Sequence, residues 1–158
     1  MTRTVIGVGN PYRRDDGVGP AVIDRLRSRV DPAVHLVVTD GEPTQLLDAW
    51  AGTELAIVID AVLCERPEPG RLHRSDAVGA PAGAAAGTHA LGMPDAIRLA
   101  EVLDRMPRRL VVYAVEAAEL GFGAGLTPAV AASVPAIVAA VLDELTRGPA
   151  PEPAGPPS

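Results

Sequence analysis

The chain has few cysteines, few positive charges and few long apolar runs, and each shortage excludes something. Its single cysteine, Cys64, excludes an internal disulfide and fits a reducing cytoplasm. Its 14 basic residues, against 20 acidic ones, leave a net charge of −6, whereas nucleic-acid binders normally carry a basic surface. We find no apolar run near the ~18–20 residues of a membrane span, and the first strand begins too early to leave room for a signal peptide. We therefore expect a cytoplasmic protein that binds neither nucleic acid nor a membrane.

What the sequence does contain is an alternation of strand and helix patterns. With 158 residues, 47% of them apolar, it is long enough for one globular domain. Buried strands are predicted at 3–9, 33–40, 54–62 and 108–116, with a short edge strand at 70–74. Helices are predicted at 17–29, 43–52, 93–106 and 127–145. This order predicts an α/β fold, a three-layer αβα sandwich with a mostly parallel twisted sheet, as a single domain over residues 1–147 with a disordered Pro-rich tail at 148–158.

Polar residues gather where these strands end. In such a sheet, ligands bind beyond the carboxyl ends of the strands, so the residues found there are candidates for a functional site. The candidates in chain order are Asn10, Asp15, Asp16, Asp40, Asp60, His89 and Glu116. A rim of carboxylates with one histidine is unusual for a nucleotide site and natural for a cation.

The glycine-rich stretch "GVGNPYRRDDGVG", which begins at Gly7, could instead bind a dinucleotide or cap a helix. A dinucleotide fingerprint needs glycine at its first, third and sixth positions; Gly7 and Gly9 match, but Tyr12 occupies the sixth. Two carboxylates would also repel a pyrophosphate at the start of the helix. As a cap, Asp15 or Asp16 would satisfy the N-terminus of the following helix, and we expect one of them to do so. A cap explains one acid but not the pair.

The same stretch resembles a known family. "VIGVGNPYRRDDGVGPAVIDRL", "IVIDAV", "THALGMPDAIRLA" and "VVYAVE…GLTPAV" are similar to motifs of the hydrogenase maturation endopeptidases, and the resemblance extends over residues 3–145. These enzymes remove a C-terminal extension from the large subunit of nickel–iron hydrogenases. The resemblance implies that this chain is an endopeptidase acting on a nickel-loaded large-subunit precursor.

The resemblance also implies which residues form the site. It assigns Asp16, Asp60 and His89 as the catalytic and metal-sensing residues, which face nickel carried by the substrate without any organic cofactor. Two carboxylates and one imidazole suit Ni²⁺ or Zn²⁺ better than Ca²⁺ or Mg²⁺. Residues beside them would orient a ligand or a water, or contact the substrate: Asn10, Asp15, Asp40 and Glu116.

Two other functions stay open. A peptidyl-tRNA hydrolase-like esterase shares the Gly-x-Gly-Asn-Pro turn, but Tyr12 replaces the glycine that follows it and the catalytic histidine is missing. A non-catalytic nucleotide- or metal-binding α/β module is the third possibility. Of the remaining candidates, Cys64 is expected to be a loop or core thiol, His35 a packing residue in a strand, and His73 a solvated edge residue.

Overall fold

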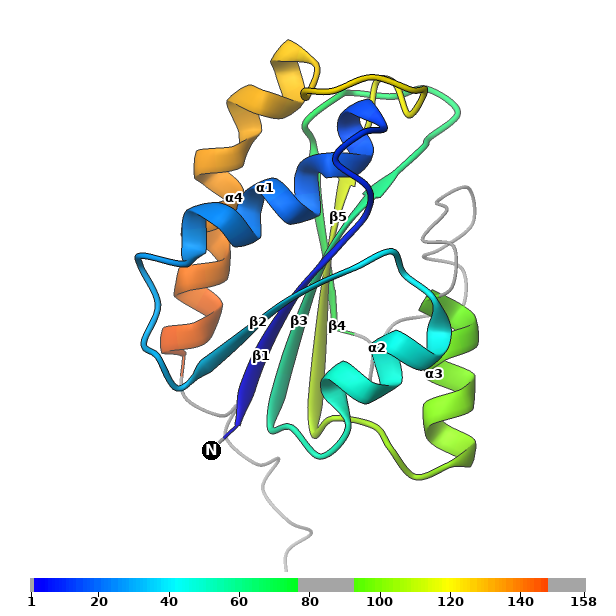
Figure 1. The fold of residues 1–158 in the computed structure, drawn as a ribbon, viewed down its shortest axis with the longest axis vertical. Helices are drawn as coiled ribbons and strands as arrows, with labels where there is room; N and C mark the ends of the chain where they lie inside the picture. The colour runs from blue at the N-terminus through cyan, green and yellow to red at the C-terminus, as the bar shows by residue number, and fades with distance from the viewer. Residues whose placement is uncertain (1, 77–92, 148–158) are drawn as a thin grey trace, which may run out of the picture.

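The computed structural model describes residues 2–76 and 93–147, which form a five-stranded sheet with helices on both faces (Figure 1). Four strands are parallel: β1 (Arg3–Val8), β2 (Val34–Thr39), β3 (Leu55–Val62) and β5 (Arg109–Glu116). The remaining strand, β4 (Leu72–Asp76), is antiparallel to β5 and lies at one edge, so the strand order is β2-β1-β3-β5-β4. The predicted mostly parallel sheet and its short edge strand are confirmed. The predictions for His89 and for the tail at 148–158 lie outside the described residues.

The helices form the two outer layers of the predicted sandwich. One face is covered by α1 (Val18–Leu26) and α4 (Pro128–Thr146), and the other by α2 (Pro43–Trp50) and α3 (Met93–Val102) (Figure 1). A one-turn 3-10 helix, η1 (Arg14–Gly17), leads directly into α1. Each helix lies within a few residues of its predicted position, so the three-layer α/β architecture is confirmed.

Alternating side chains of the strands supply two hydrophobic cores. In β1, Val5 belongs to the larger core under α1 and α4, whereas Ile6 and Val8 belong to the smaller core under α2 and α3. Strand β3 lies between β1 and β5 and is buried at every position. Such a strand is covered on both faces, as expected at the centre of a parallel sheet. The carboxyl ends of β1, β3 and β5 therefore meet at one edge of the sheet, at the top of Figure 1.

Glycines allow the first loop and α1 to lie close against β1. A Cβ atom on Gly7 would overlap the carbonyl of Gly19 in α1. Gly9 has a positive φ of +138°, and a Cβ there would overlap the backbone oxygen of Asp16. The glycine pattern is thus explained by close packing of the helix and loop on the strand, without a dinucleotide.

Two expectations for single residues were wrong. The N-cap of α1 is Gly17, with no side-chain hydrogen bond, so neither Asp15 nor Asp16 caps this helix. His35 is exposed instead of packing in the interior, because β2 lies at the edge of the sheet. His73 is exposed on the edge strand β4, as predicted.

The expectation about long apolar runs was also wrong. Helix α4 spans 19 residues with a mean hydropathy of 1.6, which is enough by length and composition alone to cross a membrane. In this fold, however, α4 buries Val130, Ile137 and Val141 in the larger core against the sheet. The apolar residues of α4 are therefore explained by its packing in the core, as in other globular domains.

Candidate functional site

Two carboxylates meet at the carboxyl edge of the sheet. Asp60 lies in β3 and is only 4% exposed. Asp16 lies in η1, which follows the first loop after β1, and is half-buried. The negative charge of Asp16 is close enough to raise the pKa of Asp60. The structure therefore brings together two of the three residues that the sequence assigned to the centre of the site.

The pKa of Asp60 is raised from 3.8 to about 7. Burial is the largest cause, since it penalises the charged form, and repulsion from Asp16 adds to it. A hydrogen bond from the backbone N–H of Ala61 acts in the opposite direction. A carboxyl group with this pKa exchanges its proton near neutral pH, so it can serve as an acid or as a base.

The first loop holds Asp16 in place through its own backbone. The N–H of Asn10 donates to Oδ2 of Asp16 at 2.8 Å, and Oδ1 of Asn10 accepts from the N–H of Tyr12 at 2.9 Å. Asn10 thus closes a tight turn with its side chain and orients Asp16 with its main chain. The structure places Asn10 against Asp16, while its role towards a ligand, a water or the substrate stays a prediction.

Asp15, the neighbour of Asp16, has a different environment. Its side chain is 0% exposed, and its carboxylate accepts hydrogen bonds from the backbone N–H groups of Ala118, Glu119 and Thr127 at 2.7–3.2 Å. The hydroxyl of Thr127 donates to the same carboxylate at 2.8 Å and 2.9 Å. Both oxygens are therefore occupied by the loop between β5 and α4. The expectation that Asp15 orients a ligand or contacts substrate is replaced by a structural role.

Glu116 also has a structural role that the sequence did not predict. This buried carboxylate accepts from the N–H of Glu68 at 3.0 Å and lies 2.7 Å from Nε2 of His73. Its pKa is lowered, first by the bond from Glu68 and then by His73. Glu116 therefore fastens the β3–β4 loop to the end of β5, and no hydrogen bond within the described ranges joins it to Asp16 or Asp60.

Two further candidates lie apart from the acid pair. Asp40 is exposed after β2, and its Oδ1 accepts from the N–H of Glu42 at 3.1 Å, so it forms a local turn. Cys64 is half-buried in the β3–β4 loop, where burial and a hydrogen bond with Glu116 raise the pKa of its thiol. A raised pKa keeps the thiol protonated at neutral pH, so the loop position predicted for Cys64 is confirmed and a nucleophilic role is not supported.

Of the three residues assigned as metal contacts, the two that the structure describes, Asp16 and Asp60, have the chemistry to bind a cation. Two oxygen ligands, Asp16 and Asp60, repel one another, and a positive ion beside them would relieve that repulsion. Among residues 2–76 and 93–147, no group of three His, Cys, Asp or Glu residues is placed to hold a metal ion. The third assigned residue, His89, lies outside those ranges.

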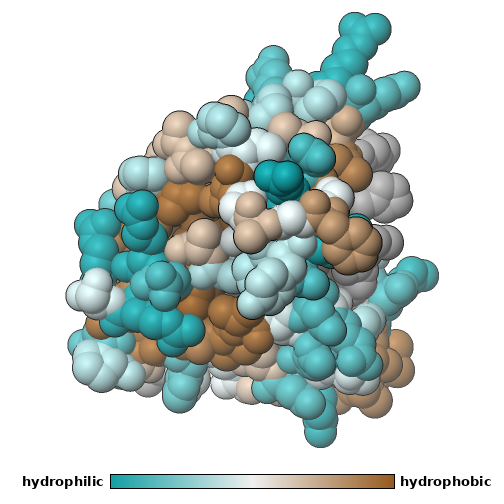
Figure 2. All heavy atoms as spheres, turned by 45° about the horizontal axis from the view of Figure 1, so that its top comes forward, coloured by the Kyte–Doolittle hydropathy of each residue, from teal (hydrophilic) through white to brown (hydrophobic). Residues whose placement is uncertain are grey.

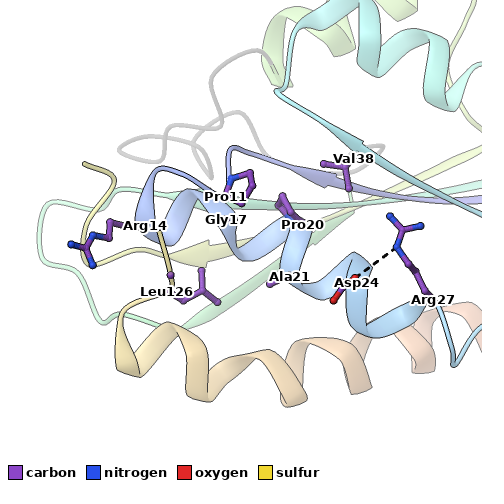
Figure 3. A pocket seen from close by; sticks show the side chains of 10 residues that line it. Pro11, Arg14, Gly17, Pro20, Ala21, Asp24, Arg27, Val38 and Leu126 are labelled. Carbon is purple, nitrogen blue, oxygen red and sulfur yellow. Dashed lines mark ion pairs between the residues drawn. The ribbon is translucent and has the colours of Figure 1, made fainter. Parts of the chain in front are cut away.

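A groove lies beside the first loop. It has a volume of about 390 Å³ and runs along α1, with Pro11, Pro20 and Val38 on its walls (Figure 3). At one end stands Arg14; towards the other, Nε of Arg27 lies 3.9 Å from Oδ1 of Asp24. Sequence reasoning missed this groove, because its lining comes from segments far apart in the chain.

Sequence reasoning also missed Thr127 as the partner of Asp15. The only sequence signal was its place before Pro128, which predicted a helix N-cap. Thr127 does occupy that position, but its hydroxyl makes no cap bond and donates to Asp15 instead.

Comparisons with known proteins identify the family and agree with the fold. A family model described as hydrogenase maturation protease matches residues 20–144. The chain is 27% identical to the hydrogenase 2 maturation protease of Escherichia coli K12, over 92% of this chain and 91% of that protein. It is 30% identical to the hydrogenase expression/formation protein HupD of Bradyrhizobium diazoefficiens, over 80% of this chain and 68% of that one. Among solved structures, the hydrogenase maturating endopeptidase HybD from E. coli superposes with a TM-score of 0.77 at 24% identity, covering 92% of both chains.

Proposed function

Because the chain belongs to the hydrogenase maturation protease family, whose members are peptide hydrolases, we propose that it removes the C-terminal extension of a nickel-loaded large-subunit precursor of a nickel–iron hydrogenase. The family match does not favour the peptidyl-tRNA hydrolase-like esterase or the non-catalytic binding module. The single cysteine is compatible with a cytoplasmic location, which we propose for this reaction.

The acid pair carries this proposal. Asp60 has a pKa of about 7 and lies beside Asp16, as aspartyl-type hydrolysis requires of a carboxyl pair. In the ionised form, Asp60 accepts a proton from the water that attacks the scissile carbonyl carbon. In the protonated form, it donates that proton to the leaving amine nitrogen.

Nickel enters this proposal as cargo of the substrate. Together with the imidazole of His89, the carboxylate of Asp16 and one oxygen of Asp60 would supply donors of the kind that Ni²⁺ accepts, and the other oxygen of Asp60 would be left for proton transfer. Without a thiolate, such a set binds a free ion weakly, whereas a metal already held by the precursor arrives together with the peptide to be cut. Metal loading thereby becomes the specificity determinant, since binding energy is available only when metal and peptide come together.

The test is to incubate the purified protein with nickel-loaded, zinc-loaded and metal-free forms of the precursor and to weigh the products by mass spectrometry. We expect cleavage of the nickel-loaded form alone, and loss of that cleavage in His89→Ala. Efficient cleavage of the metal-free precursor would contradict metal sensing and leave a peptidase that relies on its carboxyl pair alone. Normal processing by His89→Ala would remove the histidine from the site.

A further inference from the structure

Two of the four aromatic residues in this chain are exposed, and both lie at the carboxyl edge of the sheet. Phe122 is 91% exposed and Tyr12 is 71% exposed, whereas Trp50 and Tyr113 are buried. With only 3% aromatic residues in the chain, such exposure at one place is a specific feature. Exposed aromatic side chains gathered in one patch are typical of protein-binding surfaces.

Backbone pairing holds these two residues next to one another. The N–H of Gly123 donates to the carbonyl oxygen of Tyr12 at 2.9 Å, and the N–H of Arg14 donates to that of Gly123 at 2.9 Å. Arg13 and Gly123 form an isolated parallel bridge, which brings the backbone segments that carry Tyr12 and Phe122 alongside one another. We call residues 11–14 and 121–126 the two-loop platform.

Buried groups anchor the platform. Asp15 fastens both ends of the β5–α4 loop, through Ala118 and Glu119 on one side and Thr127 on the other. Gly123 has a φ of +145°, and the side chain of Arg14 occupies the space that a Cβ at Gly123 would fill. A surface that is already ordered before binding loses little conformational entropy on binding.

The platform is continuous with the candidate site and with the groove. Arg14 belongs both to the platform and to η1, the 3-10 helix that carries Asp16. Leu126 and Pro11 belong to the platform and line the groove (Figure 3). Figure 2, which brings this edge of the molecule forward, shows hydrophobic surface interspersed with hydrophilic side chains, part of it in hollows.

Two arginines, Arg13 and Arg14, lie on the platform beside the aromatic pair, and the carboxylate of Glu119 lies near Gly121. Arg13 and Arg14 form no ion pair with any residue in the part of the chain that the structure describes, and Nε of Arg14 is buried without a hydrogen-bond partner. In a chain with a net charge of −6, two unpaired guanidinium groups at one place favour a partner with acidic groups.

From these observations we infer that the two-loop platform is the docking surface for the folded body of the hydrogenase precursor, which would present an apolar patch with acidic side chains at its rim. This inference rests on the proposed function and names the surface by which the same substrate is recognised. Tyr12 and Phe122 insert into the apolar patch, Arg13 pairs with the acidic rim, and Asp16 and Asp60 face the scissile segment beside it.

The test compares KM and kcat for cleavage of the nickel-loaded precursor. We expect Phe122→Ala and Tyr12→Ala each to raise KM by about tenfold or more while kcat stays within twofold, as for truncation of an aromatic binding residue. Val102→Ala is the matched control, because Val102 is an equally exposed apolar residue (82%) at the end of α3, away from the platform. It should leave both constants unchanged. Arg13→Gln should raise KM less and make it less dependent on salt.

A binding measurement without catalysis makes the outcome unambiguous. In an Asp16→Asn background, Phe122→Ala should weaken binding of the nickel-loaded precursor by the same factor as it raises KM, with an unchanged melting temperature. If the wild-type protein cuts the precursor and Phe122→Ala leaves KM unaltered, the docking surface alone is overturned. A wild-type protein that leaves the precursor uncut would overturn the proposed function itself. A dimer that Phe122→Ala dissociates without changing KM would show the platform to be a self-association surface, and would also overturn the inference.

Discussion

Asp15 and Asp16 are adjacent in the chain and chemically identical, yet the fold uses them in opposite ways. Asp15 is completely buried, and its oxygens accept hydrogen bonds from backbone N–H groups and a hydroxyl. Asp16 is half-buried, accepts a hydrogen bond from the N–H of Asn10, and repels Asp60. The first arrangement satisfies a carboxylate and fixes a loop, whereas the second leaves a carboxylate able to react.

The difference shows that environment decides the role of a carboxylate. Neutral donors around Asp15 stabilise its charge and leave it no capacity for another ligand. The pair of Asp16 and Asp60 does the reverse, because the charge of Asp16 helps to raise the pKa of Asp60, and a proton or a cation beside the pair relieves the repulsion. Five variants can break or sharpen this comparison.

The largest effect is expected for Asp16→Asn. The substitution removes a charge at nearly constant shape, so the protein should fold. It also removes the repulsion that helps to raise the pKa of the proton-transferring Asp60 and a proposed nickel contact, so cleavage of the nickel-loaded precursor should fall by about 10²–10⁴-fold, the contribution typical of acid–base catalysis. The rate is followed by mass spectrometry, with the melting temperature as the control for folding. Cleavage at more than a tenth of the wild-type rate would break the comparison, because Asp16 would then be no more reactive than its neighbour.

The next largest effect is the pH dependence of folding stability that Asp60, the partner of Asp16, produces. Its pKa is raised to about 7 in the folded protein, so the folded state holds a proton that the unfolded chain releases near pH 4. Stability should therefore fall as pH rises from about 4 to 7, and Asp60→Asn should be more stable than wild type at pH 8 by about 2–4 kcal/mol, with little difference at pH 4. Denaturant titrations at the two pH values measure this difference.

A pH titration followed by NMR of the Asp60 carboxyl carbon sharpens the comparison between Asp15 and Asp16. Asp16→Asn should lower the pKa of Asp60, because repulsion from Asp16 is one of its causes, whereas removing Asp15 should leave it in place. Equal shifts in the two variants would mean that both acids face Asp60.

These roles mark the limit of what the sequence could predict. Strand periodicity gave the four parallel strands, and the rule that ligands bind at strand ends brought Asp16 and Asp60 together. The partners of Asp15 lie 103–112 residues away, and no local pattern encodes which of two adjacent acids turns towards them. Glu116 follows the strand-end rule as well as Asp60 does, yet contacts with Glu68 and His73 make it structural. Periodicity places a residue at an edge but does not determine the groups that meet it there.

A smaller effect is expected for Asp15→Asn, which should lower the stability of the fold more than it lowers activity. The amide keeps one acceptor oxygen but turns a donor towards the N–H groups of Ala118 and Glu119 or of Thr127. Leaving such buried donors unpaired should destabilise the fold by about 2–3 kcal/mol, whereas Thr127→Val, which removes one hydroxyl, should destabilise it by about 1 kcal/mol. Chemical denaturation measures both values. One hydrogen bond contributes about 1 kcal/mol, so a free energy of unfolding of Asp15→Asn within about 0.5 kcal/mol of wild type would mean that the loop does not depend on Asp15.

The smallest effect is expected for truncation of the C-terminal tail after Arg147. Helix α4 ends at Thr146, the N–H of Arg147 donates to the carbonyl of Asp143 at 3.0 Å, and Arg3 donates to the carbonyl of Leu145. The end of the helix is thus already satisfied before residue 148, and the last 11 residues contain five prolines and no large apolar side chain. Truncation after Arg147 should therefore leave both the melting temperature and the cleavage rate unchanged within error. A truncated protein that folds normally but cleaves more slowly would instead assign substrate binding to the tail, which would then share that role with the platform supported by Asp15.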